Sequence, residues 1–110
     1  MFRVIDSAGG LLFVIGMVGR DESGRAVEGI EQQTEVTLHR IEDALATKGR
    51  DRHAIVRLRF YVVDMRLWPA AREVVDKFFE GDIPPSTAVG VTGLVEPQIL
   101  IEIDAEASAS

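Results

Sequence analysis

The sequence predicts an α+β domain in which two helices cover one face of a mixed sheet. Two segments carry apolar residues at intervals of three and four, which is typical of amphipathic helices, and five other segments are extended in character. In chain order they give β-β-α-β-α-β-β. Two helices with one apolar stripe each can cover only one face of a single sheet, so we expect the other face to be open.

The first two strands are expected at residues 1–6 and 11–18, joined by a glycine-containing turn. Residues 11–18 are apolar on both faces, which indicates a strand covered by a helix on one side and by another subunit on the other. Gly16 inside it predicts a bulge or a close backbone approach. An apolar strand on an otherwise open face predicts a closed oligomer.

The first helix is expected from Ile30 to Lys48. Its apolar stripe is formed by Ile30, Thr34, Leu38, Ile41 and Leu45. Lys48 and Gly49 suit the C-terminal end of a helix. His39 lies beside the stripe with no metal-ligand cluster near it, so we interpret it as a surface or boundary residue.

The third strand is expected from Ala54 to Val63. Its apolar face is predicted to hold Val56, Leu58, Phe60 and Val62, and its other face Ile55, Arg57, Arg59, Tyr61 and Val63. The two arginines leave two alternatives open. That face is either solvated or meets acids or a neighbouring subunit.

The second helix is expected to be capped by Asp64, with Pro69 in its first turn and Gly81 after its end. Its apolar stripe is formed by Ala71, Val74, Val75, Phe78 and Phe79.

Two final strands, Ser86 to Leu94 and Ile99 to Ala105, are expected to be joined by a short turn. Glu102 interrupts the apolar alternation of the second one, so it lies either at an exposed edge or in a polar cleft. A single domain is expected over residues 1–107, with a disordered tail at 108–110. The composition of the segment from Ala105 to Ser110 predicts that disorder begins at Ala105.

Composition excludes several functions. The 18 acidic and 12 basic residues give a net charge of −6, which does not suit a nucleic-acid binder. Cysteine is absent, so disulfides and thiolate metal sites are excluded, and no phosphate-binding loop or metal motif predicts a cofactor. The longest apolar run, residues 11–18, is far shorter than the roughly 20 residues of a membrane span. We therefore expect a cytoplasmic protein without a membrane partner.

The C-terminal pattern resembles a known family. Pro84, Thr87, Val89, Val91 and Leu94, followed by Ile101, Glu102, Ile103, Asp104 and Ala105, are similar to the signature of the Rid (reactive intermediate deaminase) family, also called YjgF-like or endoribonuclease L-PSP. Further similar segments are residues 11–16, 29–34, 61–65 and 78–79, so the resemblance runs from about Phe2 to Ala107.

The resemblance implies a chorismate-mutase-like fold, a homotrimer, and small-molecule sites in clefts between subunits. Members hydrolyse reactive enamines and imines, such as 2-iminopropanoate, to ketoacids and ammonia. An arginine holds the substrate carboxylate and a carboxylate positions the attacking water. The carboxylate position corresponds to Glu102, which we predict to be catalytic.

The remaining site positions depart from the family pattern. The arginine position holds Ser86, and the thiol position two residues on holds Ala88. Ile15 precedes the strand glycine where the family has serine, and Phe2 stands at the tyrosine position. The predicted substrate-binding residues are Ser86, Thr87, Ala88, Gly16, Phe2, Ile15 and Arg72.

Arg72 stands where arginine-bearing members often have asparagine in the second helix. Either Arg72 or Arg59 is a candidate to restore anion binding. The alternative is that both form ion pairs at the subunit interface. Because the usual guanidinium is missing, the predicted function is a trimeric hydrolase of small enamine or imine compounds with an altered substrate. The alternatives are a non-catalytic metabolite-binding trimer and, less favoured by the acidic composition, an endoribonuclease.

Overall fold

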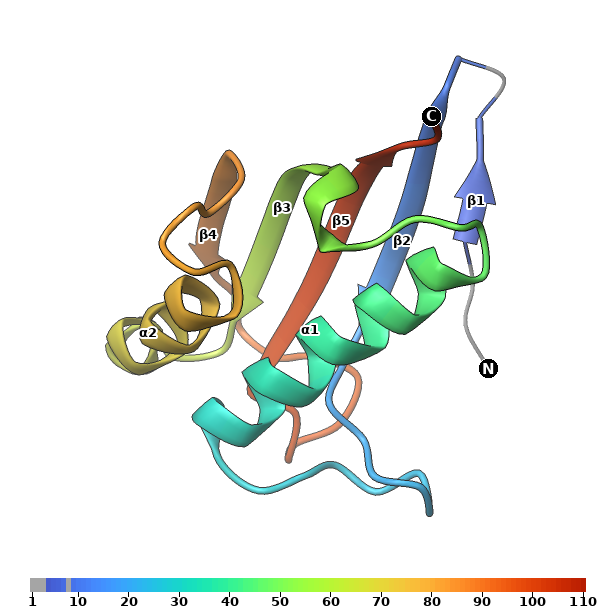
Figure 1. Ribbon diagram of the computed structural model, residues 1–110. Helices are drawn as coiled ribbons and strands as arrows, with labels where there is room; N and C mark the ends of the chain where they lie inside the picture. The colour runs from blue at the N-terminus through green and yellow to red at the C-terminus, as the bar shows by residue number, and fades with distance from the viewer. Residues whose placement is uncertain (1–3, 8) are drawn as a thin grey trace.

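Five strands form one mixed sheet, and both helices lie on the same face of it (Figure 1). The computed structural model describes residues 4–7 and 9–110. In chain order the elements are β1 (Val4–Asp6), β2 (Leu11–Met17), α1 (Ile30–Ala46), β3 (Ile55–Val62), α2 (Trp68–Phe78), β4 (Ser86–Gly90) and β5 (Ile101–Ser108). Short 3₁₀ turns at Arg52–Ala54 and Met65–Leu67 precede β3 and α2. The predicted α+β class and element order are confirmed.

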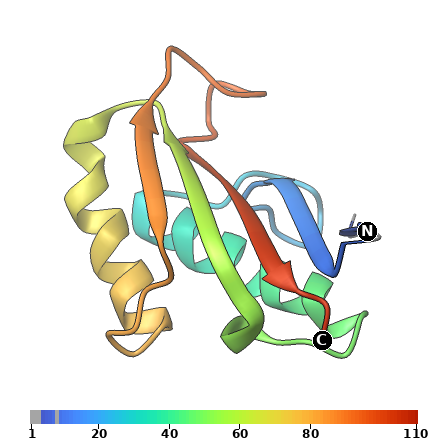
Figure 2. The same ribbon diagram turned by 90° about the horizontal axis from the view of Figure 1, so that it is seen from above.

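The strand order is β1-β2-β5-β3-β4, with β3 and β4 parallel and every other neighbouring pair antiparallel. Parallel neighbours need a crossover, and α2 supplies it between β3 and β4. Figure 2 shows the result: β4 lies at one edge beside α2, and β5 lies in the middle of the sheet.

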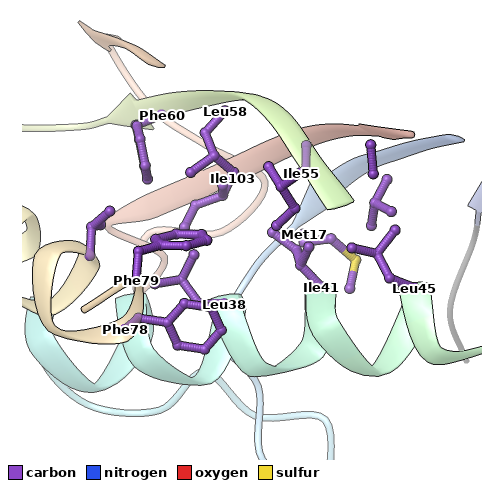
Figure 3. Close-up of a cluster of buried hydrophobic side chains, with 14 of the residues drawn as sticks. Met17, Leu38, Ile41, Leu45, Ile55, Leu58, Phe60, Phe78, Phe79 and Ile103 are labelled. Carbon is purple, nitrogen blue, oxygen red and sulfur yellow. The ribbon is translucent and has the colours of Figure 1, made fainter. Parts of the chain in front are cut away.

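The core lies between the sheet and the helices (Figure 3). Leu58 and Ile103 point from the sheet toward the side of α1 that carries Leu38 and Ile41, while Phe60 contacts Trp68 of α2, and Leu58, Ile103, Leu38, Ile41 and Phe60 are each at most 1% exposed. In β5, buried and half-buried residues alternate along the whole strand, as the period of two predicts.

Both helices begin and end close to the predicted residues. The helix α1 ends two residues before Lys48, and Gly49 follows with a φ of 72°, the left-handed conformation expected after a helix. Asp64 accepts a hydrogen bond from the backbone N–H of Arg66 at 3.0 Å and so caps the turn that leads into α2. Pro69 occupies the first turn of α2, where no intrahelical N–H bond is lost.

The prediction for the apolar face of β3 was wrong at one end. Leu58, Phe60 and Val62 are buried, but Val56 is 46% exposed and Ile55 is buried in its place. A register irregularity between Ile55 and Arg57 inserts an extra residue, which moves the residues before it to the other face.

The last two strands differ from their predicted ends and do not form a hairpin. The strand β4 stops at Gly90, β5 starts at Ile101, and β3 lies between them in the sheet. Their connection is therefore a loop over residues 91–100 rather than a short turn.

The predicted disorder from Ala105 onward was also wrong for the first residues of that segment. The strand β5 continues to Ser108, Ala107 is completely buried, and the N–H of Ala109 donates to the carbonyl oxygen of Gly10 at 2.9 Å. Within the described residues, neither helix has the length and apolar character that crossing a membrane requires.

Candidate functional site

Glu102 and Asp104 lie on the open face, the sheet surface that points away from α1 and α2. They alternate with the buried residues Ile101, Ile103 and Ala105 of β5. In the neighbouring strand β3, Tyr61 pairs with Glu102 and Arg59 pairs with Asp104, which places all four side chains on this face.

Glu102 is half-buried, and its surroundings disfavour a negative charge. Burial raises the pKa of the Glu102 carboxyl above its ordinary value, and the charge of Asp104 raises it further. A carboxylate with a raised pKa is a better proton acceptor near neutral pH than an ordinary glutamate.

Asp104 is fixed by hydrogen bonds from two other strands. The backbone N–H of Gly16 donates to its Oδ1 at 2.7 Å, and the hydroxyl of Tyr61 donates to its Oδ2 at 3.2 Å. This arrangement depends on a bulge in β2, since the register shifts between Val14 and Met17 and Gly16 has a φ of 74°. Bulges are frequent next to active sites because they re-aim backbone and side-chain groups.

The predicted bulge at Gly16 is thus present, but within the protomer its N–H is bound to Asp104. Sequence reasoning placed Asp104 on the same face as Glu102 without giving it a role. Its partner Gly16 lies 88 residues away in the chain, so no local pattern could have revealed the contact.

Ile15 borders the same region. It is 54% exposed and lines a small hollow of about 40 Å³ with Phe13, Arg59, Asp104 and Glu106. This hollow is too small for a metabolite in a single protomer, since ligand pockets are typically about 300–1,000 Å³.

Ser86 and Ala88 lie on the other face of the sheet, toward the helices. They pair with the buried residues Leu58 and Phe60 of β3, so their side chains point to the same side as that core. The hydroxyl of Ser86 donates to the carbonyl oxygen of Pro84 at 2.6 Å. Thr87, between them, pairs with Arg59 and therefore lies on the open face.

Arg72 lines the same groove as Ser86 and Ala88. This groove, between α2 and β4, has a volume of about 370 Å³. The other residues that line it are Phe60, Trp68, Val75, Ile83 and Pro84.

The predicted site residues consequently form two groups separated by the sheet. Glu102, Thr87, Ile15 and Gly16 belong to the open face, together with Arg59. Ser86, Ala88 and Arg72 belong to the α2–β4 groove. Phe2 lies outside the described residues. Among those residues, no group of three His, Cys, Asp or Glu side chains is arranged to hold a metal ion.

A helix-backed mixed sheet with a carboxylate pair on its open face defines a small α+β protein of the chorismate-mutase-like class. The chain belongs to the family described as endoribonuclease L-PSP, also known as YjgF or Rid, whose model matches residues 3–109. The resemblance noted from the sequence is thereby confirmed.

Individual relatives agree with this assignment. A RutC family protein of Aquifex aeolicus is 27% identical over 98 residues, which cover 88% of this chain and 78% of the relative. The crystal structure of Rv2704 from Mycobacterium tuberculosis, a YjgF/YER057c/UK114 family member, is 34% identical with a TM-score of 0.85, covering 96% of this chain and 84% of that one. The Rid family protein YyfA of Yersinia pestis is 26% identical with a TM-score of 0.88, covering 96% and 84%.

Proposed function

We propose that this protein is a homotrimeric, cytoplasmic hydrolase of small enamines or imines, with Glu102 as the general base. The observation that carries the proposal is a half-buried carboxylate with a raised pKa on an open sheet face, in a chain of the Rid family. In the proposed reaction Glu102 accepts a proton from water as the water oxygen bonds to the C=N carbon. Glu102 passes that proton to the nitrogen, which has received the electron pair of the C=N bond, and a carbinolamine forms. Glu102 then moves the hydroxyl proton of the carbinolamine to the nitrogen as the C–N bond breaks, so the products are a carbonyl compound and ammonia and Glu102 is again a carboxylate. An enamine reacts in the same way after its tautomerisation to the imine.

The separation of the site residues supports a site between copies of the chain. Glu102 and the α2–β4 groove cannot face one ligand within a protomer, because the sheet lies between them. Two copies can bring them together if the open face of one meets the groove edge of the next. The exposed apolar residues of the open face, Ile15 at 54% and Val89 at 42%, suit such a contact.

The test is hydrolysis of imines generated in situ, including 2-iminopropanoate, followed by ammonia release. Glu102→Gln keeps the size of the side chain and removes its basicity, so we expect the rate to fall about 10²–10⁴-fold. Glu106→Gln is the matched control, since Glu106 is on the same strand and face and its nearest cation, Arg57, is 3.9 Å away. Equal rates for wild type and Glu102→Gln would contradict the proposal.

One observation favours the alternative of a non-catalytic binding protein. The Gly16 N–H donates to Asp104 and so is not free to stabilise developing negative charge. Saturable ligand binding with no turnover of any imine would support that alternative. An endoribonuclease function is the least favoured of the three, because the chain carries a net charge of −6.

A further inference from the structure

The outer surface of the two helices carries a groove that takes no part in the proposed chemistry. Its wide part has a volume of about 930 Å³ and lies between Glu31 of α1 and the first turns of α2. A narrow part of about 210 Å³ continues to Phe78, and both parts are lined by Val74 and Lys77. Together they form the α1–α2 groove. Because both helices lie on the sheet face opposite Glu102, assembly of copies through the open face leaves this groove accessible (Figure 1).

Each helix contributes to the groove a row of residues spaced four apart. The row on α1 is Glu31, Glu35 and His39, and the row on α2 is Ala70, Val74 and Phe78. Residues four apart lie one above another on the same side of a helix, so each row forms a ridge. The row on α1 is exposed and polar, whereas the apolar row on α2 is half-buried or buried and forms the floor. Ridges with this spacing are the surfaces on which a further helix packs.

The rim of the groove is acidic. Four carboxylates line it and form no ion pair within the described residues, namely Glu31, Glu35, Glu73 and Asp76. Arg72 and Lys77 also line the groove without an ion pair, while Arg52 is paired with Glu42. Four carboxylates against two cations leave an excess of negative charge. This acidic rim favours a basic partner over a phosphate-bearing one.

The apolar row and the acidic rim together determine which partner fits. A small cation contacts the acidic rim but leaves the apolar row uncovered. A second copy offers no free helix, because in residues 4–7 and 9–110 both α-helices already pack on the sheet. An amphipathic helix uses both features, since its apolar side packs on the floor and its flanking residues reach the rim.

We propose that the α1–α2 groove docks a basic amphipathic helix of a partner protein. Small apolar side chains of that helix pack on the apolar row, and its lysines and arginines lie beside the acidic rim. The 11 residues of α2 rise about 16 Å, which matches about three turns of the docked helix. This inference goes beyond the proposed function, because docking requires neither Glu102 nor turnover.

The probe is a synthetic peptide of about 18 residues, with alanine or leucine three and four positions apart and lysines on both sides of this stripe. The comparison peptide carries glutamate in place of each lysine. Both peptides are labelled with fluorescein and titrated with the protein, and binding is followed by fluorescence anisotropy. We expect the basic peptide to bind in a saturable manner, with an affinity about tenfold or more above that of the acidic peptide.

Variants separate the two features of the groove. Glu31→Gln combined with Glu35→Gln is expected to weaken binding of the basic peptide about threefold to tenfold, since exposed ion pairs contribute modestly. Asp43→Asn combined with Glu22→Gln is the matched control, because it removes two exposed carboxylates that do not line the groove.

Ala70→Gln adds a neutral side chain to the floor, so it is expected to weaken binding about tenfold by steric exclusion. Thermal unfolding verifies that each variant is folded. Absent saturable binding of the basic peptide, equal affinity for the two peptides, or equal weakening in the two double variants would overturn the inference.

Two further outcomes would replace it with another occupant. If spermidine binds in a saturable manner and Ala70→Gln leaves peptide binding unchanged, the groove takes a small cation and the inference fails. If Ala70→Gln lowers the oligomeric mass in sedimentation, the groove is an interface between copies and the inference fails as well.

Discussion

Glu102 and Asp104 stand two residues apart on β5, yet their surroundings differ. Asp104 accepts hydrogen bonds from the backbone N–H of Gly16 and the hydroxyl of Tyr61. Glu102 has no such donors among the described residues, and burial and the neighbouring charge disfavour its ionisation. Two neighbouring carboxyl groups commonly have separate roles in a site when their surroundings differ.

The first prediction concerns this pair. In Asp104→Asn the neighbouring charge is gone, so we expect the pKa of Glu102 to fall, while burial, the larger cause, keeps it above the ordinary value. The acidic limb of the pH profile of kcat/KM therefore moves to lower pH. Asparagine retains an oxygen that can accept the Gly16 N–H, so the bulge is preserved. The pH profile of Glu106→Gln serves as the control. If the acidic limb of the profile does not move in Asp104→Asn, the charge of Asp104 does not affect the pKa of Glu102.

A second residue-scale prediction concerns the pair that ties α1 to the segment before β3. Arg52 donates to both carboxylate oxygens of Glu42 at 2.7 and 2.6 Å, and its guanidinium lies 3.7 Å from the centroid of the Phe78 ring. These hydrogen bonds lower the pKa of Glu42 in the folded state. The stability they contribute is present above the unfolded pKa and is lost as the pH falls through the folded pKa.

Glu42→Gln is therefore expected to lower the free energy of unfolding by roughly 1–2 kcal/mol at neutral pH, allowing for partial solvent screening. The difference from wild type should shrink as the pH falls through the lowered pKa of Glu42, because the carboxylate then becomes protonated. Urea unfolding at several pH values measures it. A difference that is independent of pH would show that packing, rather than charge, accounts for the effect.

At the scale of elements, the loop over residues 91–100 is held in place from α1. Gln33, 1% exposed, donates to the carbonyl oxygens of Val27 at 3.0 Å and Gln98 at 2.8 Å, and its Oε1 accepts from the N–H of Leu100 at 2.8 Å. Gly19 must lack a side chain here, since a Cβ would lie 2.8 Å from the Gln33 carbonyl oxygen. One side chain thus fixes the entry into β5, and with it the position of Glu102.

Gln33→Ala removes three hydrogen bonds and leaves partly buried backbone groups unpaired, so we expect a loss of roughly 1–3 kcal/mol in the free energy of unfolding. Gln32→Ala, at the exposed neighbouring position, is the matched control. Hydrogen exchange should also accelerate at Leu100 and Ile101 in Gln33→Ala. If both variants unfold at the same urea concentration, Gln33 does not hold the loop.

The same elements show what the sequence can and cannot predict. Alternation along β5 and the stripe of α1 are local patterns, so the faces of these elements and the position of Glu102 were predictable. The insertion of β3 between β4 and β5, and the bulge near Val56, depend on pairing between distant strands. A shift of one residue in register reverses which face a side chain occupies, and local sequence does not encode it. The separation of Ser86 from Glu102 by the sheet was missed for this reason.

At the scale of the whole molecule, Glu102 and the α2–β4 groove lie on opposite faces of the sheet. This separation allows a test of whether each site is formed by two copies of the chain. If each site combines Glu102 of one copy with the α2–β4 groove of another, two inactive variants can complement each other. Glu102→Gln removes the base and leaves the groove intact. Ser86→Phe fills the groove from an exposed position and leaves Glu102 intact. Each variant alone is expected to be inactive.

Unfolding the two variants together in equal amounts and refolding them allows their copies to mix. In a closed ring with random mixing, about one quarter of the sites then pair an intact Glu102 with an intact groove, so about a quarter of the wild-type activity should return. Refolding each variant separately and mixing afterwards, before subunits exchange, is the control. A site built within one chain contains a defect in every copy, so no activity at all would return, and the inter-subunit arrangement would be refuted.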